Sequence, residues 1–111
     1  MANNIPLTLR LPADLNEQLN RIAKATGITK TNLLRQSIYD YLDVPEIKIS
    51  DFNILPVYGT EKHRIVLNIN SYTYDILEKQ SKKFSLSFNN LLAYSSIKIL
   101  QYYSKLTKES E

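Results

Sequence analysis

The chain has 111 residues, which suffices for one ordinary domain or for two very small units that share a core. Hydrophobic residues make up 43% and charged residues 23%, a balance typical of a globular chain rather than a disordered one. Because cysteine is absent, disulfides and thiolate metal sites are excluded, and the net charge of +3 permits a nucleic-acid partner without requiring one.

The first predicted element is a short strand, Pro6-Leu7-Thr8-Leu9-Arg10-Leu11-Pro12. Leu7, Leu9 and Leu11 alternate with more polar residues. One face of the strand is therefore apolar and expected to be buried (the dry face), and the other is polar and expected to face solvent (the wet face). Pro12 favours a helix that begins directly behind it, because proline fits the first helical turn.

Two helices follow the strand. The apolar stripe of the first helix is Leu15, Leu19, Ile22 and Ala23, and its solvated side is Asn16, Glu17, Asn20, Arg21 and Lys24. Gly27 is expected to end this helix in a left-handed conformation, and Thr29 to cap the second helix. The second apolar stripe is Leu33, Leu34, Ile38, Tyr41 and Leu42, and Pro45 prevents the helix from continuing.

The same pattern returns 58 positions later, without gaps, over about forty residues. Ile65, Leu67 and Ile69 take the places of the strand leucines, and Leu91, Leu92, Ile99 and Leu100 those of the second stripe. Gly27 becomes Ser85, which predicts a different turn geometry. Ile22 becomes Gln80, so we expect Tyr74, Leu77 and Phe84 to fill the space, and Tyr103 and Leu106 to extend the last helix.

We therefore divide the chain into a first repeat (residues 1–43), a connector (44–61) and a second repeat with an extended last helix (62–111). Both repeats are net positive, whereas residues 43–60 hold one Lys/Arg against three Asp/Glu. The connector is too apolar for a free linker, so we expect it to pack on the surface through Ile47, Ile49, Phe52, Ile54 and Leu55.

The order of a short alternating strand, a helix, a glycine turn and a helix opened by Thr29-Lys30-Thr31 resembles the ribbon-helix-helix family of Arc, MetJ and CopG. Leu7-Thr8-Leu9-Arg10-Leu11-Pro12 and Gly27-Ile28-Thr29-Lys30-Thr31-Asn32-Leu33 look most like CopG-type members. The resemblance implies a mainly α fold with a short two-stranded antiparallel ribbon, here as tandem β-α-α units. It also implies a sequence-specific regulator of transcription that reads the major groove of double-stranded DNA with the ribbon.

Family members are usually homodimers of a single unit, but this chain holds two. We expect the two repeats to pair within one chain, with Thr8 opposite Val66. A homodimer, or cooperative assembly on DNA, remains an alternative.

On this interpretation the wet face of the ribbon contacts the bases. Arg10 and Arg64 can donate hydrogen bonds to guanine O6 and N7, and Asn68 can pair with adenine. Thr8 can form a hydrogen bond with either base, and Val66 can contact a thymine methyl group. The alternative is that the two arginines are ordinary solvated charges on an exposed strand.

Phosphate contacts are expected at the N-termini of the second helices, where unpaired N–H groups favour an anion. The candidates are Thr29, Lys30, Thr31, Ser87 and Asn89. Helix capping is the simpler role for these residues, and it is compatible with phosphate binding.

Two other classes of protein remain open. A helix-turn-helix reader would place Asn32, Arg35 and Gln36 in the groove, but the second repeat lacks the matching Ala23 and Gly27 while keeping the strand. A protein–protein module, as in antitoxins, would use the ribbon for pairing and the connector or last helix for a partner.

An enzyme is not expected. His63 is the only histidine, Gly27 and Gly59 are the only glycines, and the acidic residues are scattered. We therefore expect no catalytic residue, cofactor or metal site. Because no apolar run reaches about 18 residues and the start Met1-Ala2-Asn3-Asn4 lacks a secretory signal, we expect a cytoplasmic protein with no membrane partner.

Overall fold

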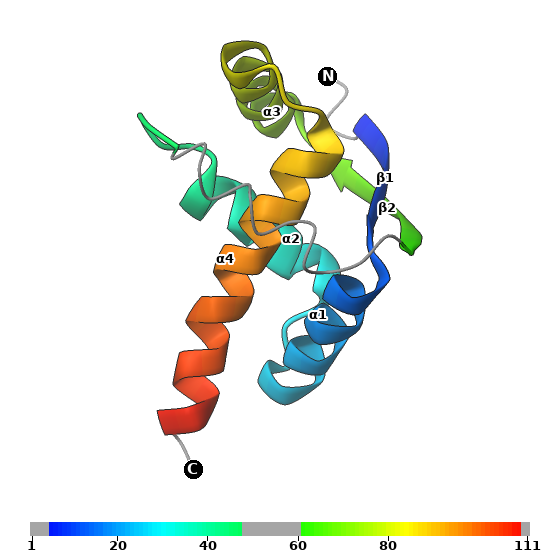
Figure 1. Cartoon of the computed structure of the whole chain (residues 1–111), viewed down its shortest axis with the longest axis vertical. Helices are drawn as coiled ribbons and strands as arrows, with labels where there is room; N and C mark the ends of the chain where they lie inside the picture. The colour runs from blue at the N-terminus through cyan, green and yellow to red at the C-terminus, as the bar shows by residue number, and fades with distance from the viewer. Residues whose placement is uncertain (1–4, 48–60, 110–111) are drawn as a thin grey trace.

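The computed structural model describes residues 5–47 and 61–109 (Figure 1). The elements are β1 (Ile5–Pro12), α1 (Ala13–Thr26), α2 (Lys30–Tyr41), β2 (Lys62–Ile69), α3 (Ser71–Phe84) and α4 (Phe88–Glu109). The chain is thus mainly helical and contains the β-α-α unit twice, which confirms the predicted fold class.

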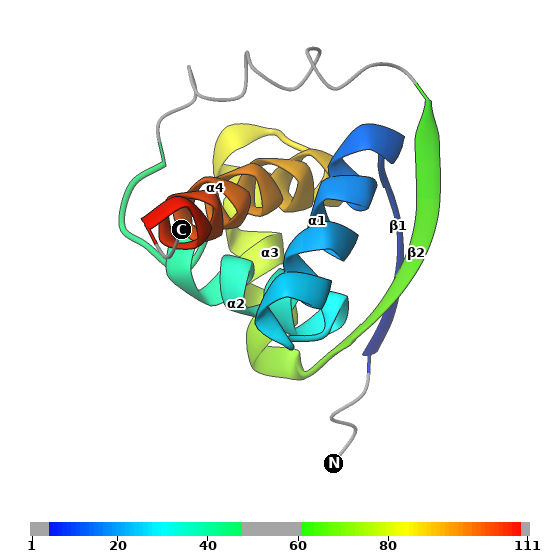
Figure 2. The same ribbon diagram turned by 90° about the horizontal axis from the view of Figure 1, so that it is seen from below.

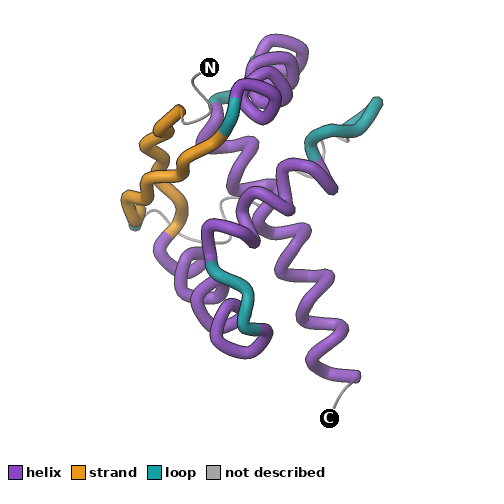
Figure 3. The backbone as a smooth tube through the Cα atoms, turned by 180° about the vertical axis from the view of Figure 1, so that it is seen from behind, coloured by secondary structure: helices purple, strands orange, loops and turns teal. Residues whose placement is uncertain are grey.

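The two strands form a two-stranded antiparallel ribbon in which Thr8 lies opposite Val66, the predicted register. Along the ribbon, Arg10 faces Arg64 and Pro6 faces Asn68. The predicted dry face is buried at Leu9, Leu11, Ile65, Leu67 and Ile69, and Leu7 is half-buried. The helices lie on this side of the ribbon (Figures 2 and 3).

A disulfide across the ribbon tests whether one chain closes it. The main-chain N–H of Arg10 bonds to a helix, so it points away from β2, and Thr8 two residues earlier does the same. Such non-hydrogen-bonded pairs have Cα atoms about 4.5 Å apart, which a disulfide can span. We expect a variant with Thr8→Cys and Val66→Cys to oxidise to a monomer, because the native chain has no cysteine.

Non-reducing mass analysis checks this result, with Thr8→Cys plus Ala25→Cys on the exposed side of α1 as the control. A disulfide-linked dimer as the main product in dilute solution would place the pairing between chains instead.

The two repeats meet around a pseudo-twofold axis at a pair of buried serines. Ser37 in α2 and Ser95 in α4, which are 58 positions apart, have hydroxyl oxygens 3.0 Å from each other. Each hydroxyl also lies near a carbonyl of its own helix, at 2.6 Å from Leu34 O and 3.2 Å from Leu92 O. Because serine is small, α2 and α4 can pack closely at this point. The buried residues of both repeats form one hydrophobic core.

The helix ends correct one prediction. Gly27 ends α1 with a φ of 79°, as expected. Ser85, however, keeps the same left-handed geometry with a φ of 55°, so the predicted change of turn is wrong. A residue with a Cβ atom in this conformation costs about 1–3 kcal/mol. Two bonds to Ser81 offset that cost: Leu86 N donates to Ser81 O at 3.1 Å, and Ser81 Oγ donates to Leu86 O at 2.6 Å.

Asn16 corrects a second prediction, since it is buried rather than on the solvated side of α1. Its Oδ1 accepts a hydrogen bond of 2.8 Å from Lys30 Nζ at the start of α2. The polar side chain is therefore satisfied by the neighbouring helix. The other predicted solvated residues of α1 are exposed, namely Glu17, Asn20, Arg21 and Lys24.

Gln80 occupies the position of Ile22 as a buried side chain, and it joins the two repeats. Its Nε2 donates to Leu42 O at 2.7 Å and to Val44 O at 3.2 Å, just beyond the C-terminus of α2. Its Oε1 is buried and has no hydrogen-bond partner among the described residues. The cost of burying this oxygen offsets part of the stabilisation from the two hydrogen bonds.

We expect Gln80→Ala to lower the free energy of unfolding by about 1–3 kcal/mol, because it leaves the Leu42 carbonyl without this buried donor. Urea unfolding measures the change. Lys79→Ala, at the exposed neighbouring position, should stay within about 0.5 kcal/mol of the parent. Equal effects of the two substitutions would show that the hydrogen bonds of Gln80 contribute nothing to stability.

Helix α4 is longer than α2, with 22 residues against 12, as predicted, and its C-terminal end reaches past the other helices (Figure 1). Tyr103 is half-buried against the core, whereas the side chain of Leu106 lies outside the described residues.

Of the connector's apolar residues, Ile47 is buried, and Ile49, Phe52, Ile54 and Leu55 lie outside the described residues. No helix in the described ranges has the length and apolarity needed to span a bilayer.

Candidate nucleic-acid interface

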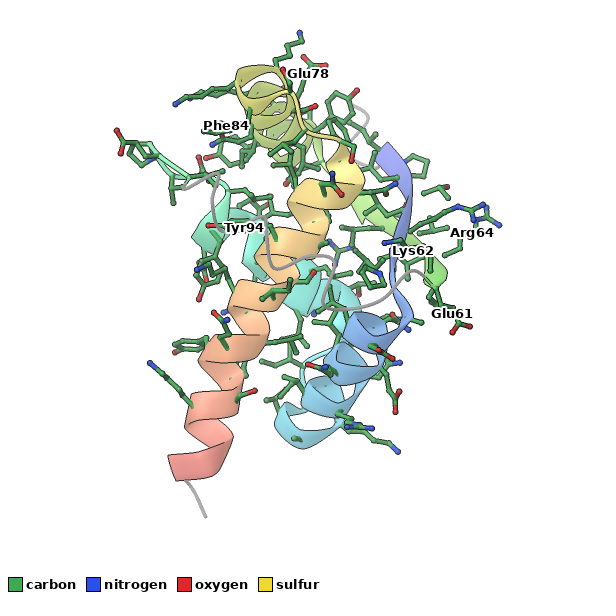
Figure 4. All side chains as sticks on the ribbon, in the orientation of Figure 1. Glu61, Lys62, Arg64, Glu78, Phe84 and Tyr94 are labelled. Atoms are coloured by element: carbon green, nitrogen blue, oxygen red, sulfur yellow. The ribbon has the colours of Figure 1, made fainter. Side chains whose placement is uncertain are left out.

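The outer face of the ribbon is formed by side chains that point away from the helices. This face consists of Pro6, Thr8 and Arg10 from β1 and Arg64, Val66 and Asn68 from β2, and all six residues are exposed. Figure 4 shows Arg64 directed away from the helical layer. Val66 lies at the centre of this face and is 50% exposed. An apolar side chain in this position does not contribute the stabilisation that full burial would give. The ribbon therefore brings the five predicted base-contact residues onto one surface.

The alternation of the strands is what produces this surface. Each dry-face residue anchors the ribbon on the helices, and the residues between them must then point outward. A shift of either strand by one residue would turn the arginine of that strand toward the helices, so the hydrophobic face fixes which side chains are presented.

The N-terminus of α4 lies against β1 of the other repeat. Asn89 Oδ1 accepts a hydrogen bond of 3.0 Å from the main-chain N of Arg10. Ser87 caps α4 by accepting from Asn90 N at 3.1 Å. Together with Lys62 these residues line a pocket of about 220 Å³ beside the ribbon. Two cationic side chains, Arg10 and Lys62, thus line the same pocket as the helix N-terminus.

The N-terminus of α2 is arranged differently. Thr29 caps the helix by accepting from Asn32 N at 3.3 Å, and its hydroxyl lies 3.3 Å from that of Thr31. The ammonium of Lys30 donates to Asn16, and partial burial lowers the pKa of Lys30. Since an ammonium carries three donors, Lys30 retains hydrogen-bonding capacity beyond this contact.

Arg35 performs a role that the sequence did not indicate. Its guanidinium donates to the main-chain O of Asn68 through Nε at 3.0 Å and Nη2 at 2.9 Å, and to Asn32 Oδ1 through Nη1 at 3.0 Å. It thereby ties α2 to the end of β2. The matching position in the second repeat is Ala93, so the repeat pattern carried no signal for this contact.

The arrangement offers hydrogen-bond donors, cations and helix N-termini, which suit a polyanion. Within the ranges 5–47 and 61–109, no three His, Cys, Asp or Glu side chains are grouped so that they could hold a metal ion.

Comparison with known proteins identifies the first repeat. Residues 5–43 match the model of the ribbon-helix-helix proteins of the CopG family. No curated protein and no solved structure matches the chain. The matched residues comprise β1, α1 and α2, and the same order of elements recurs in β2, α3 and α4. Residues 5–43 are therefore a ribbon-helix-helix unit of the CopG family, and they form one ribbon with the second β-α-α unit of the same chain.

Proposed function

We propose that the chain is a sequence-specific regulator of transcription that binds double-stranded DNA and reads the major groove with its ribbon. The observation that carries this proposal is the exposed outer face of the ribbon, with two arginines, an asparagine and a threonine around Val66. These side chains have the donors and the methyl groups that discriminate bases in the major groove. Proteins of the matched family are typically DNA-binding regulators, and β-ribbons are a known way of reading DNA.

In this proposal Thr8, Arg10, Arg64, Val66 and Asn68 contact the bases, while Thr29, Lys30, Thr31, Ser87 and Asn89 contact the backbone. The helix N-termini beside the two ends of the ribbon support the phosphate contacts, because their N–H groups favour an anion. Capping by Thr29 and Ser87 leaves further N–H groups of the first turn available.

A helix-turn-helix mode is disfavoured by the bonds of the residues that it requires. Arg35 is bonded to Asn68 and Asn32, and Gln36 Nε2 donates to Asp40 Oδ2 at 3.3 Å. Gln36 Oε1 also accepts from Tyr103 OH at 3.0 Å. Reading bases with α2 would require the protein to break these contacts.

Binding to a random pool of duplexes, followed over a range of salt concentrations, tests the proposal. Affinity should fall as salt rises, with a slope of about −0.9 per neutralised phosphate in a plot of log K against log salt. Repeated selection should then enrich a defined sequence. Absence of any salt-dependent affinity would refute DNA binding.

The second candidate is a protein–protein module, in which the ribbon only joins the repeats. A pocket of about 550 Å³ between α1, α2 and the outer half of α4 favours this candidate, with Gln18, Tyr41, Ile97 and Tyr102 among its lining residues. Salt-independent behaviour on DNA, together with a partner protein bound at this pocket, would support it over the first proposal.

A further inference from the structure

The two ends of the ribbon are not equivalent. In a symmetric pair of identical units, the same side chains would occur at both ends. Here the 58-residue offset relates Pro6 to Arg64 and Arg10 to Asn68. The antiparallel register then places Arg10 opposite Arg64 at one end and Pro6 opposite Asn68 at the other. Both arginines of the ribbon therefore lie at the same end.

The arginine end is strongly cationic. Arg10 and Arg64 are exposed there, and Lys62 is exposed two residues before Arg64 (Figure 4). The acidic residues nearest in the sequence are Glu61, directly before Lys62, and Asp14 in the first turn of α1, and both are exposed. Three cationic side chains against two carboxylates leave this end net positive, with donors suited to guanine O6 and N7 and to phosphate.

The other end has no charged side chain on the outer face of the described strands. Pro6 offers no hydrogen-bond donor, and Asn68 offers an amide of the kind that pairs with adenine. The cation bonded at this end is Arg35, and its guanidinium is held by Asn68 O and Asn32 Oδ1. The equivalent position beside the arginine end is Ala93, so no such side chain covers Arg10.

We propose that this ribbon binds a non-palindromic DNA site in one fixed orientation, with guanines under Arg10 and Arg64 and an A·T pair under Asn68. This inference rests on the proposed function and adds the polarity of the site. Four residues of strand span about 13 Å, which corresponds to about four base pairs. The guanine contacts and the A·T pair should therefore lie about four base pairs apart, with a thymine facing Val66 between them.

Selection from a random duplex pool tests the polarity with the full chain and with a double variant, Arg10→Asn with Asn68→Arg. This variant exchanges the two side chains between equivalent positions, so net charge is unchanged and one arginine occurs at each end. The main-chain contacts of both positions, with Asn89 and with Arg35, do not depend on these side chains. Thermal unfolding of the variant checks that the fold is retained.

For the parent chain we expect a motif with guanines at one end only, and a roughly 5- to 150-fold loss of affinity for each guanine replaced. In the double variant the guanine preference should divide between the two ends. A second variant, Asn68→Arg alone, should add a guanine preference at the A·T end.

A palindromic parent motif, or a variant motif identical to that of the parent, would overturn the polarity while leaving DNA binding intact. No enriched motif and no salt-dependent affinity would instead overturn the proposed function, and the polarity with it.

Discussion

Replacing both ribbon arginines, Arg10→Ala with Arg64→Ala, should abolish specific DNA binding while leaving the chain folded. Each arginine paired with a guanine contributes about 1–3 kcal/mol of discrimination. Losing both should therefore weaken binding to the preferred site by roughly 30- to 10,000-fold or more. Among the residues that the structure describes, neither guanidinium donates a hydrogen bond to another side chain or to the main chain, and Arg10 contacts Asn89 through its main-chain N. Fluorescence anisotropy with the selected duplex measures the change.

A matched control removes the same charge from a different surface. Arg21→Ala with Lys24→Ala alters two exposed residues on α1, where Arg21 forms a solvent-exposed ion pair with Glu17. This control should retain the selectivity for the preferred site and lose only long-range attraction, which salt screens. If both double variants lose the same affinity, net charge rather than base contact explains the binding.

The largest expected effect on stability is that of Leu67→Ala in the dry face of β2. Leu67 is fully buried, and removing its side chain leaves a cavity between the ribbon and the helices. Such substitutions cost about 2–5 kcal/mol, a large share of the roughly 5–15 kcal/mol that stabilises a small domain. The variant should unfold at much lower urea concentration and lose DNA binding as a consequence.

Val66→Thr, at the adjacent position on the outer face, is the control for Leu67→Ala. Threonine keeps the β-branched shape, and Val66 is already half exposed, so the change in unfolding free energy should stay within about 1 kcal/mol. The methyl group of threonine can still contact a thymine methyl group, so the preference for thymine at the central position should be retained. Comparable destabilisation by both variants would contradict the assignment of the two faces.

The ribbon could be predicted from the sequence because its signals are local and occur twice. The alternation of leucine with polar residues predicted which face of each strand is buried and which is exposed. The 58-residue offset predicted Val66 as the antiparallel partner of Thr8. Gly27 and Thr29 could be assigned because cap chemistry depends on a few neighbouring atoms. The base-contact residues followed from the same alternation, although their contacts with DNA stay a prediction.

Other features could not be predicted because they depend on contacts between the repeats. Asn16 is buried by its bond to Lys30, and Gln80 by its bonds beyond the end of α2. Arg35 reaches Asn68, 33 residues away, with no counterpart at Ala93. Periodicity assigns a polar residue to the solvent and does not identify the specific polar partner that makes burial favourable.

The measurement that bears most directly on the account is the change in backbone amide chemical shifts when the selected duplex is titrated into the chain. We expect the largest changes in the ribbon, at Thr8, Arg10, Arg64, Val66 and Asn68, with little change on the exposed side of α1. Changes confined to Asn32, Arg35 and Gln36 of α2, or to the outer half of α4, with an unaltered ribbon, would contradict it.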